Sequence, residues 1–130
     1  MTAKVGVSEM ARKSEELLTS DLLRGNSITL VLSVLASAAA PGYVVTELIR
    51  LRSGKRIDFK DGSVYPLLHD LQNRGLVTSE WEIREGERPK RVYALTAAGK
   101  AELERRTAAW RDFARGVDLV LEGERGGDSS

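Results

Sequence analysis

The order of patterns along this sequence predicts a mainly α-helical fold that carries one small β-hairpin. A leucine-spaced segment between residues 61 and 75 predicts a helix, and a segment with a period of two predicts a hairpin up to residue 95. Helical spacing returns from residue 96 onwards. A helix, a hairpin with a charged tip and a further helix, in this order, are what a winged helix-turn-helix requires. We therefore predict that fold, followed by a long C-terminal helix.

The composition places the chain among ordinary globular proteins. It has 130 residues, enough for one domain, with 42% hydrophobic and 30% charged residues. The absence of cysteine excludes disulfides and thiolate metal sites, and it favours a reducing cytoplasm. No run approaches the roughly 20 apolar residues of a membrane span, so we expect no membrane segment and a cytoplasmic location.

Four segments are expected along the chain. The final one is polar and rich in glycine, which is typical of disorder. The segments are an N-terminal helix that contacts a partner (1–25), the winged helix-turn-helix (26–95), a C-terminal dimerisation helix (96–122) and a disordered tail (123–130).

Two helices and a short strand are expected in the first half of the winged domain. Asn26 or Ser27 is a suitable N-cap for the first helix, which Pro41 and Gly42 end. A second helix is predicted over residues 43–52, and a short strand over residues 56–59. The apolar positions that predict the first helix are Ile28, Val31, Leu32 and Leu35.

The next helix, predicted over residues 63–74, has one apolar and one polar face. Ser63 is its expected N-cap, and Pro66 falls in the first turn, where a proline removes no intrahelical hydrogen bond. The apolar face consists of Val64, Leu67, Leu68 and Leu71. The opposite face is centred on Gly62, Pro66, His69 and Asn73, with Tyr65 and Asp70 at its flanks.

The hairpin combines alternating apolar residues with balanced charge. Val77, Trp81 and Ile83 share one face of the first strand, and the second strand runs over residues 90–95. Residues 80–91 carry four acidic and four basic side chains, which is consistent with a solvated hairpin. Three basic residues follow the turn, and we expect them to point toward a phosphate backbone while the acids face away. They are Arg88, Lys90 and Arg91.

Apolar stripes lie at both ends of the chain. Thr96 is the expected cap of the last helix, whose stripe is narrow and typical of a helix that pairs with another helix. Both stripes would be exposed on a monomer, so we predict a homodimer. The stripes consist of Leu17, Leu18 and Leu22 near the N-terminus and of Leu103, Trp110, Phe113, Val117 and Val120 in the last helix.

Residues 50–60 hold a further cluster of positive charge. Five basic residues stand there against the single Asp58. The cluster is either a solvated helix end or an edge that faces phosphates. The residues that would supply backbone charge are Arg50, Arg52 and Lys55.

Residues for catalysis are hard to find in this sequence. It has one histidine, no glycine-rich phosphate loop and no ligand set with metal spacing. His69 lies on the outer helix face and has no second imidazole or thiolate to work with. We therefore expect no enzymatic activity, no metal and no cofactor.

Several of these motifs together resemble the PadR family of bacterial transcriptional regulators. The resemblance runs from about Leu22 to Leu121, and its most specific parts are a Tyr-Pro pair before a leucine-spaced helix and an Arg-Pro-Lys-Arg-Val-Tyr strand. The matching segments are residues 22–25, 41–43, 62–71, 75–77, 80–81, 88–96 and Gly99. The chain departs from the family pattern at Pro41 and Val44, where histidine and glutamate are common.

The resemblance implies a homodimer built from a winged helix-turn-helix and one C-terminal dimerisation helix. Such proteins usually act as repressors that a small ligand or another signal releases from DNA. A two-fold symmetric dimer implies a near-palindromic double-stranded operator. The side chains that we expect at the DNA are Ser63, Tyr65, Pro66, His69, Asn73, Arg88, Lys90, Arg91, Arg50, Arg52 and Lys55.

Two interpretations stay open from the sequence. Trp110 resembles a residue that stacks on a small aromatic effector in some relatives, but a role as filler of the dimer core is favoured. The alternative to a DNA-binding regulator is a winged-helix adaptor that binds another protein. The outer face of the helix over residues 63–74 is polar and nearly neutral, so it does not decide between DNA and protein as the partner.

Overall fold

The structure, a computed structural model, contains four helices and three strands in the described residues. The backbone is described for residues 2–60 and 62–129, and the side chains for residues 8–15, 17–60 and 62–123. The elements are α1 (Thr2–Ser37), β1 (Ala40–Pro41), α2 (Gly42–Arg52), α3 (Val64–Asn73), β2 (Val77–Glu82), β3 (Lys90–Leu95) and α4 (Ala97–Ser129). The mainly helical fold with a small antiparallel sheet confirms the prediction.

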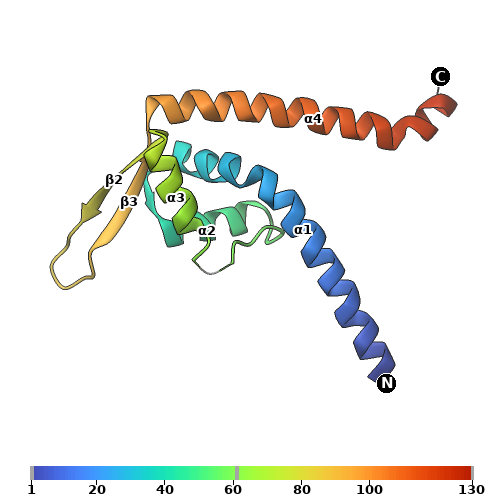
Figure 1. Cartoon of the computed structure of the whole chain (residues 1–130), viewed down its shortest axis with the longest axis horizontal. Coiled ribbons are helices and arrows are strands. Elements are labelled where there is room, and N and C mark those ends of the chain that lie inside the picture. Colours follow the sequence, from blue (N-terminus) through green and yellow to red (C-terminus); the bar gives the residue numbers. More distant parts are fainter. Residues whose placement is uncertain (1, 61, 130) are drawn as a thin grey trace.

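The core forms where α1, α2 and α3 pack against the base of the hairpin. Figure 1 shows this compact part with the β2–β3 hairpin projecting at one end and α1 and α4 extending at the other. The predicted apolar faces of α1 and α3 are buried, which confirms their helical spacing. The fully or nearly buried side chains include Val31, Leu32, Leu35, Val45, Val64, Leu68, Leu71, Val77 and Tyr93.

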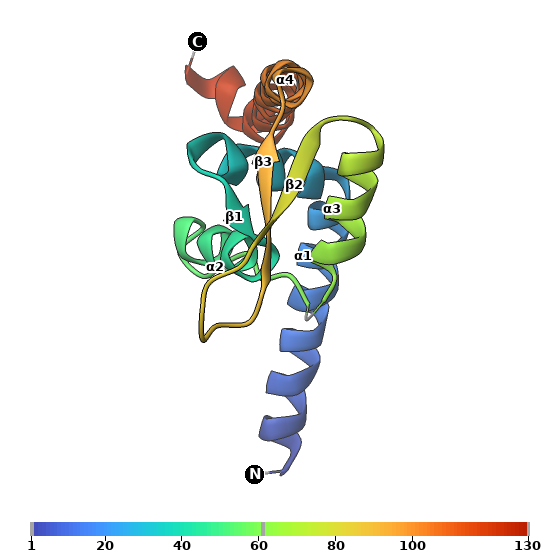
Figure 2. The same cartoon turned by 90° about the vertical axis from the view of Figure 1, so that its left-hand side faces the viewer.

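The helix α1 is continuous, so the predicted start of a new helix at Asn26 or Ser27 is wrong. The amide nitrogen Nδ2 of Asn26 donates to the Leu22 carbonyl oxygen (2.7 Å) within the helix and therefore does not cap a new one. Gly25 lies mid-helix, where glycine costs about 1 kcal/mol relative to alanine but does not end a helix. In Figures 1 and 2 the N-terminal part of α1 projects away from the compact part.

The third strand comes from an unexpected place. The sheet order is β1-β3-β2, and β1 pairs antiparallel with β3 through Ala40 opposite Tyr93 and Pro41 opposite Val92. The strand predicted over residues 56–59 is not formed. The Ile57 amide donates instead to the Ser53 hydroxyl (3.0 Å), so a side chain satisfies the group that a strand would offer to its neighbour.

The start of α4 is tied to the loop before β2. The Gly99 amide donates to Thr96 Oγ1 (3.0 Å), which confirms the predicted cap, and that hydroxyl donates to the Gly75 carbonyl oxygen (2.7 Å). The Thr96 amide also donates to the Leu76 carbonyl oxygen (3.1 Å). A Cβ on Gly99 would clash with that same Leu76 oxygen, so the helix can approach this closely only with glycine there.

The helix α4 is longer than the sequence predicted. Its backbone continues past Leu121 to Ser129, although the glycines in this segment weaken a helix. Most of the predicted tail, residues 123–130, lies outside the residues whose side chains are described.

Candidate nucleic-acid interface

The outer face of α3 is polar and open to solvent. All five residues predicted there are exposed, whereas Val64, Leu68 and Leu71 on the opposite side are buried in the core. The predicted division of α3 into two faces is therefore confirmed. The exposed residues are Ser63, Tyr65, Pro66, His69 and Asn73.

The first turn of α3 is stabilised differently from the prediction. Ser63 precedes the helix but forms no side-chain cap, because its own backbone is already in the helical region. Its hydroxyl donates to the Lys60 carbonyl oxygen instead (2.7 Å). Pro66 lies in the first turn as predicted, where no intrahelical bond is lost.

Tyr65 is the one large side chain of this face whose position the fold restricts. Its ring lies against the start of α2, where a Cβ on Gly42 would come within 2.5 Å of the Tyr65 Cε1 atom. Half of the side chain, 47%, stays exposed. Sequence reasoning did not assign Gly42 to the site, although the Pro-Gly-Tyr motif at residues 41–43 was a signal for it.

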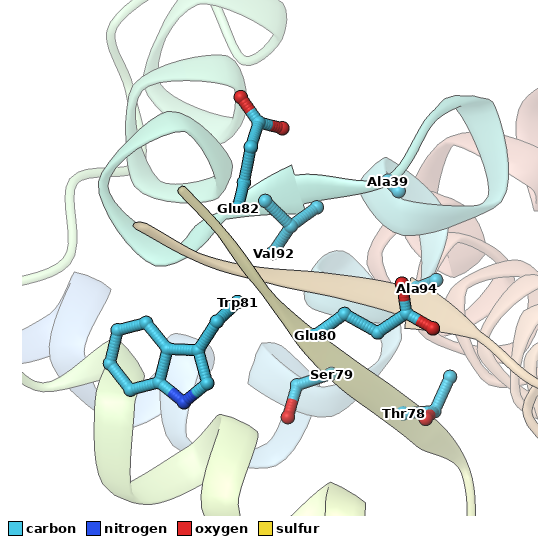
Figure 3. Close-up of a pocket in the computed structure, with 8 residues that line it drawn as sticks. All are labelled: Ala39, Thr78, Ser79, Glu80, Trp81, Glu82, Val92 and Ala94. Carbon is cyan, nitrogen blue, oxygen red and sulfur yellow. The ribbon is translucent and has the colours of Figure 1, made fainter. Parts of the chain in front are cut away.

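The wing, which we define as the hairpin of residues 77–95, has two different faces. Trp81 lies opposite Arg91 and Glu82 lies opposite Lys90. Figure 3 shows Trp81 and Ser79 on one side of the hairpin and Glu82 and Val92 on the other. Arg91 therefore shares a face with Trp81, away from the acids.

Lys90 does not follow the prediction that the basic residues turn away from the acids. It shares the face of Glu80 and Glu82, because side chains in a strand alternate and Lys90 pairs with Glu82 in the register. Lys90 is also partly buried, whereas Arg88 at the tip is exposed. Of the three predicted wing cations, Arg91 is the one that the strand register places away from the acidic face.

The apolar face of the first wing strand is buried only at its base. Val77 is in the core, but 61% of Trp81 and 76% of Ile83 are exposed, because the hairpin extends beyond the helices that could cover them. The face on which Trp81 and Arg91 lie is therefore aromatic, apolar and positively charged. Sequence reasoning had assigned no role at the site to Trp81 and Ile83.

The basic cluster at the end of α2 is partly neutralised by contacts within the chain. Arg50 donates two hydrogen bonds to Glu47, at 2.6 and 3.0 Å, and these bonds hold the pKa of that carboxyl below its usual range. Arg52 donates to the Ser37 hydroxyl (3.1 Å). Lys55 is exposed in a turn with φ of 65°. The cluster consequently offers less positive charge than its composition indicates.

The apolar stripes at the two ends of the chain are exposed with one exception. Leu103, predicted to be exposed on a monomer, instead packs against the core, because α4 passes over α1 at this point. Trp110 and Phe113 lie next to each other, with ring centroids 6.3 Å apart. The exposed members of the stripes are Leu17, Leu18, Leu22, Trp110, Phe113, Val117 and Val120.

Two other kinds of site are absent from the described part of the chain. No group of three histidine, cysteine or acidic side chains is arranged there for a metal ion. None of the helices described has the length and apolar character that crossing a membrane requires.

The helices α1 to α3 and the hairpin define a winged helix-turn-helix. The profile of the Transcriptional regulator PadR-like family matches residues 31–105, and the chain belongs to this family. Its members and the similar proteins named below are transcriptional regulators, which are not enzymes.

Relatives with known structures or names agree with this assignment. A PadR family transcriptional regulator from Eggerthella lenta is 30% identical, with a TM-score of 0.73, over 89% of this chain and 97% of its own. A transcriptional regulator of Mycobacterium tuberculosis is 41% identical over 66 residues, which are 51% of this chain and 59% of that protein.

The third relative is the negative transcriptional regulator PadR of Bacillus subtilis. It is 30% identical over 73 residues, 56% of this chain and 40% of that protein. The structure of Bacillus subtilis PadR in complex with operator DNA has a TM-score of 0.55 and 28% identity, over 60% of this chain and 43% of that one.

Proposed function

We propose that this protein is a sequence-specific DNA-binding regulator that represses transcription from a double-stranded operator as a homodimer. The observation that carries the proposal is the exposed polar face of α3 beside a projecting wing. A helix of this width fits the major groove, where base edges can be read. Bacillus subtilis PadR supports DNA binding and repression, because its structure contains operator DNA and it is named a negative transcriptional regulator.

The side chains on α3 divide into two roles. His69 and Asn73 lie on the exposed face and carry groups that can read base edges, and an asparagine amide can bind adenine with two hydrogen bonds. The single hydroxyl of Tyr65 is better suited to a phosphate oxygen. Ser63 and Pro66 complete the groove-facing surface at the start of the helix.

Charged residues outside α3 supply contacts to the phosphate backbone. We assign this role first to Arg88 and Arg91 on the wing, and then to Lys55, Arg50 and Arg52 near the end of α2. Lys90 has the weakest claim because it lies among acids. Removal of one such cation should reduce the slope of log affinity against log salt by about 1.

The dimer would use the exposed stripes of both terminal helices. A second copy that covers Leu18 and Phe113 would hide apolar surface that a stable soluble monomer rarely leaves open. It would also place two α3 helices about one DNA turn, or about 34 Å, apart. The near-palindromic operator follows from that symmetry. A protein that binds chromosomal DNA in this way would work in the cytoplasm.

We also propose Trp110 as the contact of a small planar aromatic effector that releases the DNA. The support is the half-exposed tilted pair that Trp110 makes with Phe113, which offers ring faces for stacking. A planar ligand should quench tryptophan fluorescence in the wild type and in Trp81→Phe but not in Trp110→Phe. Equal quenching in both variants would assign Trp110 to the dimer core alone.

A mobility-shift titration with DNA from upstream of the protein's own gene tests the proposal. We expect a discrete shifted complex that unlabelled upstream DNA displaces and a scrambled duplex does not. Asn73→Ala should weaken it about tenfold, because a bidentate base contact is worth about 1–3 kcal/mol. Thr78→Ala, which removes an exposed neutral polar group from β2, is the control. A folded protein that shifts neither duplex would favour the protein-binding adaptor instead.

A further inference from the structure

A ring of hydrogen bonds joins α3 to both strands of the wing. The Ser79 hydroxyl donates to Oε1 of Gln72, which lies near the end of α3, at 2.8 Å. Arg91 Nε donates to the Ser79 hydroxyl oxygen at 2.9 Å, and its Nη2 lies 3.5 Å from the same Gln72 oxygen. One side chain each from α3, β2 and β3 therefore closes the ring.

Two aromatic rings hold the same guanidinium from the sheet face. The Arg91 Cζ atom lies 5.8 Å from the ring centroid of Trp81 and 6.0 Å from that of Tyr93. Both distances are within the range of a cation–π contact. Tyr93 is buried in the core, whereas Trp81 is exposed, so Arg91 connects the anchored base of the wing to its projecting part.

The projecting part of the wing needs such a connection because β1 pairs with β3 only at Val92 and Tyr93. Figure 1 shows the hairpin projecting beyond the helices, and a two-stranded ribbon is marginally stable by itself. Its angle relative to α3 is therefore set by contacts between α3 and the paired strands. The ring of Gln72, Ser79 and Arg91 provides them, because Ser79 lies opposite the buried Tyr93 and Arg91 lies opposite the exposed Trp81. The ring joins the wing to the same helix that carries the groove-facing residues.

We propose that Arg91 is a positioning residue that, through Gln72 and Ser79, fixes the wing at one angle to α3 so that both elements meet DNA together. The proposal rests on DNA binding as the function, and it reduces the role of Arg91 as a simple phosphate contact. Gln72 and Ser79 then influence affinity for the operator without touching DNA. Both side chains are neutral, so replacing either of them by alanine leaves the charge of the protein unchanged.

Neutral substitutions separate positioning from phosphate contact. Gln72→Ala and Ser79→Ala should each weaken binding to the upstream DNA about fivefold, as the removal of one hydrogen bond predicts, with the salt slope unchanged. Arg91→Lys should weaken it similarly, because a lysine keeps the charge but cannot make the fork of hydrogen bonds. Arg88→Ala should instead reduce the salt slope by about 1.

The matched control for the ring is the neighbouring hydroxyl of Thr78, which lies on the opposite face of β2. Thr78→Ala should leave affinity within error of the wild type. Full affinity in Gln72→Ala, Ser79→Ala and Arg91→Lys would overturn the proposal, because a simple phosphate contact needs only the positive charge.

A second measurement needs no DNA and keeps the proposal separate from the proposed function. The chain has two tryptophans, so Trp110→Phe leaves Trp81 as the single fluorescent reporter on the wing. Time-resolved anisotropy should show a larger amplitude of nanosecond motion after Gln72→Ala, while Gln72→Glu, which keeps the acceptor oxygen, should restore the restricted motion. Unchanged Trp81 motion in Gln72→Ala would overturn the proposal even in a protein that binds DNA.

Discussion

At the scale of single residues, Gly42 determines where the ring of Tyr65 lies. The two residues belong to different helices and meet only because a glycine leaves space for the ring. The far end of a tyrosine side chain can move at little cost, so the contact matters more for the position of Tyr65 than for the stability of the fold. A substitution at Gly42 should therefore change the position of Tyr65 with little effect on stability, and the two effects can be measured separately.

Gly42→Ala should weaken operator binding while changing stability by less than about 1 kcal/mol, because alanine is the better helix former and the ring can turn aside. DNA titration and thermal unfolding of the same preparation measure the two effects. In a Tyr65→Ala background, the Gly42→Ala change should have no further effect on affinity. A further loss there would mean that Gly42 acts through something other than the tyrosine ring.

Glu102 on α4 has the more strongly lowered pKa of two ion-paired carboxyls, Glu47 and Glu102, and it predicts a pH dependence of stability. Hydrogen bonds from Arg105 and Arg106 lower the pKa of its carboxyl to about 2, from an ordinary value of 4.5. A carboxyl whose folded pKa is depressed contributes stability above its unfolded pKa, and that contribution is lost as the pH falls from about 4.5 toward 2.

Glu102→Gln should therefore lower the thermal unfolding midpoint at pH 7. The difference in midpoint between this variant and the wild type should become smaller as the pH falls toward 2. Unfolding curves of both proteins across this range provide the measurement. Glu104→Gln is the control, because Glu104 is an exposed neighbour on the same helix. A difference between Glu102→Gln and the wild type that stays constant from pH 7 to pH 2 would contradict the ion-pair explanation.

At the scale of elements, the sequence predicts the helices and strands whose apolar residues follow a single period, either that of a helix or that of a strand. The helix α3 is the clearest case, because its four leucine and valine positions leave only one way to face a core. Its outer face, the candidate site, follows from the same geometry. The paired strands β2 and β3 follow from their period of two and the turn between them.

The parts that sequence reasoning missed depend on distant contacts. Nothing about Ala40 and Pro41 favours a strand locally, and they form one only because β3 offers a free edge. Leu103 is covered because α4 crosses α1, which no periodicity reveals. The ring of Gln72, Ser79 and Arg91 likewise depends on how α3 packs against the sheet. Sequence reasoning therefore gave Gln72 and Ser79 no role and predicted Arg91 only as a phosphate contact.

The packing of α3 against the core holds the exposed residues of its outer face in position. Leu68 is fully buried on the inner side of the helix, directly beside the exposed His69. Leu68→Ala should lower the free energy of unfolding by about 2–5 kcal/mol, the range for a buried leucine that leaves a cavity. Urea unfolding measures this, with His69→Ala as the surface control that should change stability by less than about 0.5 kcal/mol.

At the scale of the whole molecule, the terminal helices matter as much as the reading helix. The net charge is only +1 and part of the basic cluster is neutralised internally, so one copy has little electrostatic attraction for DNA. Two linked copies bind two half-sites at once, and the second contact is made at a high effective concentration. The proposed dimer would therefore bind an operator tightly without a strongly basic surface.

Phe113→Glu should shift the protein from dimer to monomer in light scattering at micromolar concentration, because it places a charge in the proposed interface. Operator affinity should fall by at least about a hundredfold, the lower end of the gain from linking two sites. Arg111→Glu introduces a glutamate at an exposed polar position of α4 and should leave the dimer intact. A wild-type protein that is already a stable monomer would contradict this explanation.

A hydroxyl-radical footprint of the wild-type protein on its upstream DNA tests the central claim most directly. Two symmetric copies with α3 in successive major grooves should protect two segments whose centres are about 10 base pairs apart. Removal of the dimer by Phe113→Glu should abolish both segments together. Continuous protection without this spacing, or none at protein concentrations where the fold is intact, would contradict recognition of an operator by a pair of winged helices.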